Sequence, residues 1–103
     1  MKKDLESNLT IEYAAQAAES LKTYIRSEDN PVIDLSVVER IDLAGIQLLL
    51  SVEKTGENIS KDVFFTGDLV SSVYERIFNC GFNTVFSDAS EKLFKIRRNS
   101  SEF

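Results

Sequence analysis

The chain of 103 residues contains no histidine and no tryptophan, and it has one cysteine, one proline and four glycines. Without histidine, Ser-His-Asp and Cys-His catalytic arrangements are excluded, and the commonest transition-metal ligand is missing. The single cysteine, Cys80, permits neither an internal disulfide nor a metal site built from several cysteines. General acid–base catalysis would fall to carboxylates, lysines or tyrosines. These absences favour protein recognition over catalysis, and we expect no catalytic residue, no metal ligand and no cofactor.

The chain also has little positive charge and no long apolar run. Lys and Arg number 12 and Asp and Glu 17, which gives a net charge of −5. This balance disfavours nucleic acid and anionic membrane surfaces as partners. No apolar run approaches the ~18 residues of a membrane-spanning helix, and the N-terminal stretch MKKDLESN lacks the apolar core of a signal peptide. We therefore expect a cytoplasmic protein that binds no nucleic acid and does not insert directly into membranes.

The remaining composition is that of one globular domain. Hydrophobic residues make up 43% of the chain and charged residues 28%, which is typical of folded soluble proteins. A chain of this length has room for a single core, so we expect one domain over residues 1–103, with a frayed polar tail at 99–103. Cys80, placed just before Gly81, is expected to be a small buried hydrophobic residue.

Apolar spacing predicts alternating helices and strands. Residues at spacings of three and four from Ile11 predict a first helix, capped by Thr10 or Asn8 and ended before Pro31. The further expected elements are a short strand at 3–6, strands at 32–36, 63–66 and 83–86, and helices at 43–54, 69–80 and 88–98. This order predicts an α/β domain with a small, mostly parallel, mixed sheet of four strands and about four helices.

Several residues are expected to mark the ends of these helices. Asp68 suits the N-cap of the third helix, and Asp88 with Glu91 forms a capping-box pattern for the last. Gly56 and Gly81 stand where helices commonly end in a left-handed residue.

The loops after the two central strands carry the sequences IDLAG and TGD. In parallel sheets the loops at the carboxyl ends of strands form the usual binding edge, so we expect these two loops at one edge. Asp42 is expected to cap the second helix by accepting hydrogen bonds from the amides of Ala44 and Gly45. Gly45 is expected to permit close approach of backbone, either to the sheet or to a partner.

The second helix is more apolar than packing on one face of a sheet requires. On a helical projection of residues 43–54, the polar residues Gln47, Ser51 and Lys54 fall in one narrow wedge, and aliphatic residues occupy nearly all the rest. Two explanations remain open. Neighbouring helices cover the flanks, or the N-terminal half exposes an apolar patch for a partner.

The stretch VIDLSVVERIDLAGIQLLLSVEK, residues 32–54, resembles the central signature of STAS domains, the fold of bacterial anti-sigma-factor antagonists. A strand ending in DLS leads through a short loop to ID, two further residues, a glycine and an aliphatic helix. The later stretch FFTGDLVSSVYERIFNCGF is similar to the family's next strand, TG turn and helix. The resemblance covers the chain in element order and implies a STAS-like single domain.

The resemblance implies a regulatory protein without enzymatic activity. In the family, a serine directly after the loop aspartate is phosphorylated by a partner kinase that is also the anti-sigma factor, and phosphorylation ends their interaction. Leu43 stands at that position here and cannot accept a phosphoryl group. Ser36, Ser51 and Thr66 do not match the acceptor position, so we expect no phosphoacceptor. The resemblance then implies docking onto an anti-sigma kinase-like protein through Asp42, Leu43, Ala44, Gly45, Ile46 and Gln47.

Other interpretations stay open. The wording IDLAGIQLLL is also similar to small stand-alone STAS proteins of chemotaxis gene clusters and to the STAS subunit of lipid-transporting ABC systems, which often keep a threonine in place of Leu43. A homodimer through the same helix is possible, and the oligomeric state is left open. An enzyme using Asp34, Asp42 and Asp68 is a further alternative. A divalent metal on Asp34 and Asp42 is disfavoured, because oxygen-only sites usually need more ligands.

Overall fold

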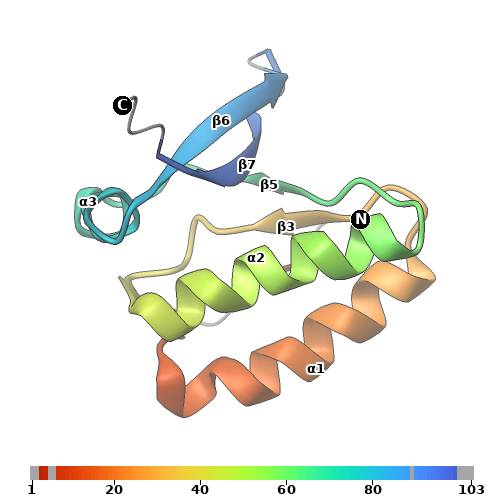
Figure 1. The fold of residues 1–103 in the computed structure, drawn as a ribbon, viewed down its shortest axis with the longest axis horizontal. Coiled ribbons are helices and arrows are strands. Elements are labelled where there is room, and N and C mark those ends of the chain that lie inside the picture. The colour runs from red at the N-terminus through yellow and green to blue at the C-terminus, as the bar shows by residue number, and fades with distance from the viewer. Residues whose placement is uncertain (1–2, 5–6, 89, 100–103) are drawn as a thin grey trace.

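The computed structural model describes residues 3–4, 7–88 and 90–99 (Figure 1). The elements, in chain order, are β1 (Lys3–Asp4), β2 (Asn8–Leu9), α1 (Ile11–Ser27), β3 (Val32–Asp34), β4 (Arg40–Ile41), α2 (Leu43–Asn58), β5 (Phe64–Thr66), α3 (Ser71–Asn79), β6 (Phe82–Asp88) and β7 (Leu93–Arg98). Within the described residues the strands form a mixed sheet in the order β1-β3-β5-β7-β6 and a separate β2–β4 pair. The strands β1, β3 and β5 run parallel, and β7 and β6 follow as antiparallel neighbours. The predicted α/β class with a mixed sheet is confirmed.

Helices α1 and α2 lie side by side along the central strands, with α2 between α1 and the sheet (Figure 1). This position explains the apolar character of α2, because Ile46, Leu49 and Val52 are fully buried and Leu48 is 7% exposed. Neighbouring elements therefore cover most of the helix, which is the first of the two explanations above. Leu43 is the exception at 47% exposure. Among the described residues, no helix combines the length and the apolar character needed to span a bilayer.

Helix α1 forms where predicted, but its first turn does not join the core. Ile11 is 73% exposed, whereas Leu21 and Ile25 are fully buried. The expectation that Ile11 belongs to the packed face is wrong, because residues 11–13 are all exposed and contact with the core begins further along the helix. At the other end, the ammonium group of Lys61 donates hydrogen bonds of 2.9 Å to the carbonyls of Ile25, Arg26 and Glu28. A cation at the C-terminus of a helix is favourable to its dipole.

Two of the expected helix ends differ from the structure. Helix α2 continues past Gly56 to Asn58, so Gly56 lies inside the helix and does not end it. A β-carbon at Gly56 would overlap the Val63 side chain, which explains the glycine at this position. Helix α3 begins at Ser71 with Val70 as its N-cap, so the expected cap by Asp68 is wrong. Gly81 does follow α3 with a φ of 96°, as predicted.

The region predicted as the last helix, 88–98, is instead the end of a β-hairpin formed by β6 and β7. Phe94 and Ile96 are buried on the core side of β7, and Lys95 between them is also buried at 9% exposure, so the middle of this strand is covered. Asp88 Oδ1 accepts hydrogen bonds from the amides of Ser90 at 3.1 Å and Glu91 at 3.4 Å, so the capping pattern stabilises the hairpin turn rather than a helix. The described residues therefore contain three helices, not four.

Candidate functional site: the loop and first turn of α2

The carboxylate of Asp42 connects the N-termini of α1 and α2. Its Oδ1 accepts a hydrogen bond of 3.0 Å from the Gly45 amide, and its Oδ2 accepts one of 3.0 Å from the Ile11 amide. The predicted capping of α2 is confirmed at Gly45, while the bond to α1 was not predicted. An anion is favourable at the N-terminus of a helix, and here one carboxylate serves two helices.

Gly45 is required by the approach of β2 to α2. A β-carbon at this position would overlap the carbonyl oxygen of Leu9 and lie 2.8 Å from Cγ1 of Ile41. Of the two possibilities left open for Gly45, the close approach is to the protein's own backbone. Gly45 and Ile46 are both buried, so in this structure they support the loop from inside and do not form its outer surface.

The outer surface of this region is formed by Ile11, Leu43 and Gln47, which we call the docking patch. Ile11 is 73% and Leu43 47% exposed, and they flank the Asp42 carboxylate because each begins one of the two helices that it caps. Gln47 is exposed one turn after Leu43, and Ala44 is partly exposed. Four of the six predicted partner-binding residues are therefore at least partly accessible, and Ile11 joins them.

A groove of about 440 Å³ lies beside the docking patch. Its lining includes Thr10, Arg40, Asp42, Ser72 and Arg76, which come from the loop before α1, from β4 and from α3. Glu39 also lines the groove, so two guanidinium groups, two carboxylates and two hydroxyls lie next to the docking patch. An apolar centre with a polar rim is the usual anatomy of a protein–protein interface.

The residues directly after β3 and the TGD loop after β5 meet at one edge of the main sheet. The IDLAG stretch, which was expected at this edge, instead begins at the end of β4, and β4 pairs with β2 outside the main sheet. The Leu35 amide donates to the Thr66 carbonyl at 2.8 Å, and Asp34 Oδ1 accepts from the Ser36 amide at 2.9 Å. Gly67 has a φ of 108°, and a β-carbon on it would come within 2.6 Å of Asp34 Oδ1 and 2.7 Å of the Ser36 amide nitrogen. The two loops are thus packed against each other with no room for a side chain between them.

The three carboxylates considered for catalysis have separate local roles. Asp42 caps two helices and Asp34 closes the turn at Ser36. The side chain of Asp68 is 92% exposed and lies 3.9 Å from the Lys92 ammonium group. Within the described residues, no group of three or more His, Cys, Asp and Glu side chains is placed to hold a metal ion.

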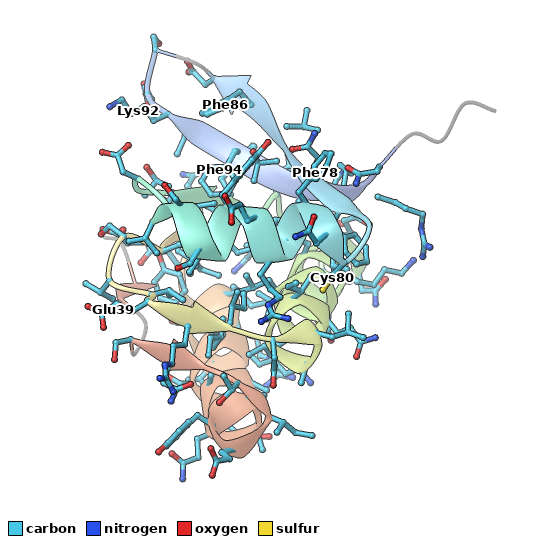
Figure 2. All side chains as sticks on the ribbon, turned by 90° about the vertical axis from the view of Figure 1, so that its left-hand side faces the viewer. Glu39, Phe78, Cys80, Phe86, Lys92 and Phe94 are labelled. Carbon is cyan, nitrogen blue, oxygen red and sulfur yellow. The ribbon has the colours of Figure 1, made fainter. Side chains whose placement is uncertain are left out.

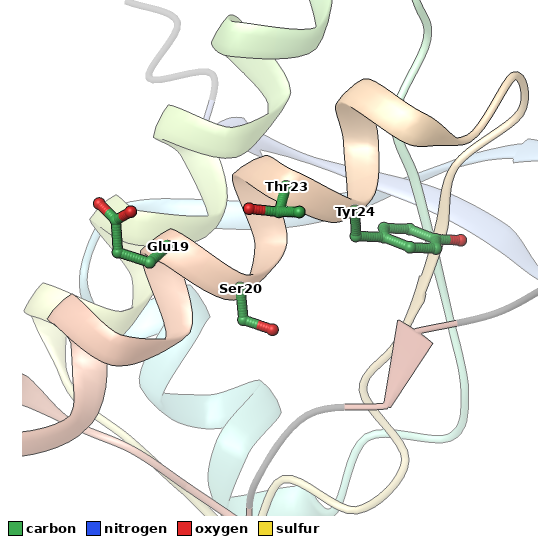
Figure 3. Close-up of a pocket in the computed structure, with 4 residues that line it drawn as sticks. All are labelled: Glu19, Ser20, Thr23 and Tyr24. Carbon is green, nitrogen blue, oxygen red and sulfur yellow. The ribbon is translucent and has the colours of Figure 1, made fainter.

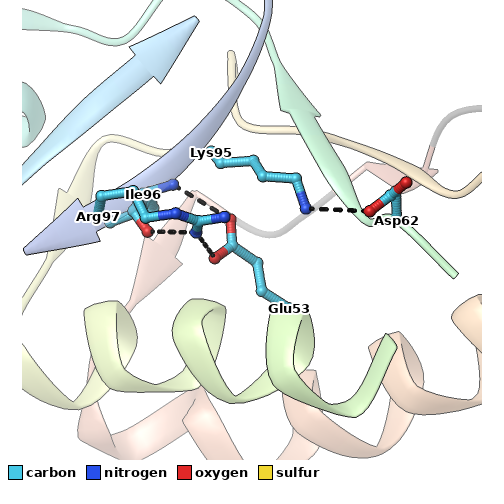
Figure 4. A network of polar contacts seen from close by, with 5 residues as sticks. All are labelled: Glu53, Asp62, Lys95, Ile96 and Arg97. Atoms are coloured by element: carbon cyan, nitrogen blue, oxygen red, sulfur yellow. Dashed lines mark hydrogen bonds and ion pairs between the residues drawn. The ribbon is translucent and has the colours of Figure 1, made fainter. Parts of the chain in front are cut away.

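A buried carboxylate on α2, Glu53, was not predicted as a site. It is 4% exposed, its Oε2 accepts from the Ile96 amide at 3.1 Å, and its Oε1 lies 2.8 Å from Nη1 of Arg97 (Figure 4). Strand β7 pairs with β5 at Phe94, and this register sets Ile96 opposite a residue before β5 begins. The carboxylate thus binds an amide that β5 does not reach.

Burial raises the pKa of Glu53, and the Ile96 amide and the charge of Arg97 partly offset this effect. Beside this cluster, the Lys95 ammonium group lies 3.8 Å from Asp62 and 5.0 Å from the centre of the Phe64 ring (Figure 4). The only sequence signal for the cluster was a charged residue, Glu53, on the apolar side of a helical pattern.

Two further features have structural explanations. An open hollow of about 500 Å³ is lined by Glu19, Ser20, Thr23 and Tyr24 (Figure 3), all from α1. The Tyr24 hydroxyl is already engaged there, since it donates to the Val32 carbonyl and accepts from the Val32 amide, both at 3.0 Å. Cys80 is partly buried and packs against the core, in agreement with a role as a small hydrophobic residue.

Comparisons of this chain with protein-family models, with curated proteins and with solved structures give no match. The likeness to STAS domains therefore stays a resemblance carried by the sequence, above all by residues 32–54. The function of the docking patch is a proposal, argued below from its geometry.

Proposed function

We propose that the protein is a regulatory binding module of the anti-sigma-factor antagonist (STAS) type, without enzymatic activity. In this proposal it docks onto a kinase-like or anti-sigma-like protein through the loop and first turn of α2. The contact is made by Leu43, Ala44 and Gln47 together with Ile11. Gly45 and Ile46 contribute by holding the turn in place.

The observation that carries the proposal is the exposure of Leu43 on a helix whose other large aliphatic residues are buried or partly buried. Ile46, Leu48, Leu49 and Val52 of α2 are buried and Leu50 is partly buried, whereas Leu43 is 47% exposed beside Ile11 at 73%. Full burial of one such side chain in an interface contributes roughly 1.5–3 kcal/mol before the costs of association. The double cap by Asp42 also holds the patch in one conformation, which lowers the entropy cost of binding.

The absence of a hydroxyl at position 43 determines the kind of regulation. A phosphate adds roughly −1.5 to −2 charges to a loop, and Leu43 cannot carry one. We propose that the module binds constitutively and that its activity is set by the amount of protein or by the partner. Partners in a chemotaxis complex or a lipid transporter would use the same surface, and so would a second copy of the chain. Self-association has little support, because most apolar residues of α2 are inside the protein.

A capture experiment with charge variants tests the proposal. Wild type, Leu43→Asp and Ile59→Asp are immobilised and exposed to lysate of the source cells, and bound proteins are identified by mass spectrometry. Ile59 is a matched control because it is 40% exposed at the far end of α2. We expect wild type and Ile59→Asp to capture a protein with a kinase-type ATP-binding domain and Leu43→Asp to lose it.

Equal capture by all three proteins would overturn the proposal, as would wild type that captures no kinase-like or transporter protein. An acidic residue is tolerated in the first turn of a helix, so Leu43→Asp is expected to fold normally. Circular dichroism of each variant checks this point. Sedimentation at micromolar concentration detects the homodimer.

A further inference from the structure

A second accessible apolar surface lies on α3 and β6, away from the docking patch. Among the described residues ten large hydrophobic side chains are exposed, and four of them, Tyr74, Phe78, Val85 and Phe86, belong to these two elements. Figure 2 shows Phe78 on α3 and Phe86 on the hairpin above it. Val85 and Phe86 are successive residues of a strand and point to opposite faces; Phe78 and Val85 line one pocket, and Tyr74 and Phe86 line another. Contiguous exposed apolar side chains mark interaction sites, so the pocket at Phe78 and Val85 is a candidate binding site.

Part of this surface is hollowed into a pocket of about 530 Å³, which we call the α3–β6 pocket. It is lined by Phe78, Asn83, Val85, Arg97, Arg98 and Asn99. Phe78 and Val85 are each 49% exposed and form its apolar part. Asn83 and Asn99 contribute amide groups, and Asn99 is anchored by donating to the carbonyls of Gly81 and Phe78.

The charge of the pocket is opposite to that of the whole protein. The chain carries a net charge of −5, yet two guanidinium groups and no carboxylate line this pocket. Arg97 is paired with Glu53. Arg98 lies over the ring of Phe82 at 5.7 Å and forms no ion pair within the part of the chain that the structure describes. Among the described residues, Arg98 therefore gives the pocket a positive charge that is not paired with a carboxylate, beside an apolar surface.

The positive charge of the pocket distinguishes two kinds of occupant, a second copy of the chain and an acidic partner. In a two-fold dimer through this surface, each copy would present the same arginines to the other, because such contacts are made by the same patch on both subunits. Like charges facing each other in an interface are unfavourable. An occupant with carboxylates is complementary, so the charge favours an acidic partner over a second copy.

The edge of β6 favours an extended peptide. β6 is the last strand of its sheet, and the Asn99 amide donates to the Gly81 carbonyl at 2.8 Å. In an antiparallel pair the main-chain groups of successive residues point alternately toward and away from the partner strand. Gly81 bonds to the chain of β7, so the main-chain groups of Thr84 and Phe86, three and five residues later, point away from β7. Asn83 Oδ1 accepts from the Thr84 amide at 2.8 Å and from the Tyr74 hydroxyl at 3.0 Å. The main chain at Phe86 remains open to an added strand.

We propose that the α3–β6 pocket binds a short, extended, acidic segment of a partner protein that carries one aromatic or large aliphatic side chain. The apolar side chain packs between Phe78 and Val85. A neighbouring carboxylate pairs with Arg98, and the main chain of the segment hydrogen-bonds at Phe86. This interaction is separate from docking at Leu43 and does not depend on it.

Fluorescence polarisation with labelled peptides tests the proposal on the full chain. The probe is the acetylated and amidated peptide DEFED, and the controls are DEADE, which lacks the aromatic ring, and KKFKK, which reverses the charge. We expect DEFED to bind and both controls to bind about tenfold more weakly or not at all, because each loses one of the two complementary features. Failure of DEFED to bind at millimolar concentration, or equal binding of KKFKK, would overturn the proposal.

Paired protein variants locate the site. Arg98→Glu and Phe78→Ser should each weaken DEFED binding about tenfold or more, whereas Arg26→Glu and Ile59→Ser, with the same chemical changes elsewhere on the surface, should not. Val85→Lys is a second apolar variant in case Phe78→Ser lowers the melting temperature. Equal affinity in all variants would place the peptide elsewhere and overturn the proposal. Binding to vesicles with anionic lipid, without binding to DEFED, would show that the surface recognises lipid instead.

Discussion

The side chain of Asp42 accepts a hydrogen bond from the amide of Ile11, 31 residues earlier in the chain, at 3.0 Å. Through this bond the first turn of α1 is held beside the first turn of α2, which the same carboxylate caps at Gly45. The two exposed apolar residues of the docking patch, Ile11 and Leu43, therefore both lie next to the Asp42 carboxylate, which links the two helix ends. The acid at the start of an apolar segment therefore shapes the surface around it.

Replacement of Asp42 tests this double role. We expect Asp42→Ala to lower the free energy of unfolding by about 2 kcal/mol, because loss of one N-cap costs roughly 0.5–2 kcal/mol and here two helices lose an acceptor. Asp42→Asn keeps one acceptor oxygen and should retain about half of that stability. Urea denaturation measures both. Identical stability of the two variants would mean that the one acceptor oxygen kept by Asn adds nothing to stability.

Gly45 and Gly81 are expected to respond differently to alanine. Gly45→Ala should cost about 3 kcal/mol or more, because its β-carbon meets the Leu9 carbonyl, which belongs to backbone and cannot turn away. Gly81→Ala should cost only about 1–2 kcal/mol, the strain of its positive φ, since no atom lies within 4 Å of an added β-carbon. Thermal unfolding compares the two. A smaller loss at Gly45 would show that β2 can move away from α2.

Local signals in the sequence were sufficient for much of the fold. The spacing of apolar residues predicted α1 and α2, and short apolar runs predicted β3 and β5, because each pattern reports on the face that the element buries. The cap at Asp42 is also a local signal, since its acceptor and its donor, Gly45, are three residues apart. The expected meeting of the IDLAG and TGD loops did not allow for β4, which separates the Asp42 loop from β3 and pairs with β2.

Contacts distant in sequence account for the errors. Asp88 and Glu91 carry a helix-capping pattern, and Asp88 does bind nearby amides, but the packing of Phe94 against Phe65, with ring centres 5.9 Å apart, makes the segment a strand. Glu53 binds the Ile96 amide across 43 positions. No local pattern contains such a pairing. The exposure of Ile11 was missed for the same reason, because it depends on where α2 begins relative to α1 and not on the spacing within α1.

Restoring a hydroxyl at position 43 tests whether its loss alone removed the switch. Leu43→Ser should leave the free energy of unfolding within about 0.5 kcal/mol of wild type, because the side chain is 47% exposed. With the captured kinase-like partner and ATP, we expect the serine variant to be phosphorylated and wild type and Leu43→Ala to remain unmodified. Mass spectrometry of the three proteins measures this. A phosphorylated wild type would show that another hydroxyl serves as acceptor.

The pH dependence of stability should reveal the buried Glu53. Burial raises its pKa in the folded protein above the ordinary value of 4.5, so between these two values the folded state binds more protons than the unfolded state. By linkage, the contribution of Glu53 to the free energy of unfolding is then fully present below pH 4.5 and is lost as the pH rises through the folded pKa. Each unit of difference between the pKa of Glu53 in the folded and in the unfolded protein corresponds to about 1.4 kcal/mol of stability. Glu53→Gln does not titrate and removes this contribution.

Urea denaturation of wild type and Glu53→Gln from pH 4 to pH 8 isolates the effect, because the other carboxylates are common to both proteins. We expect the stability of wild type relative to Glu53→Gln to fall as the pH rises. Arg97→Gln should steepen the fall, since loss of the guanidinium removes a charge that favours ionised Glu53. A relative stability that instead rises with pH would mean that Arg97 and the Ile96 amide outweigh burial. Ionised Glu53 would then stabilise the hairpin more than protonated Glu53.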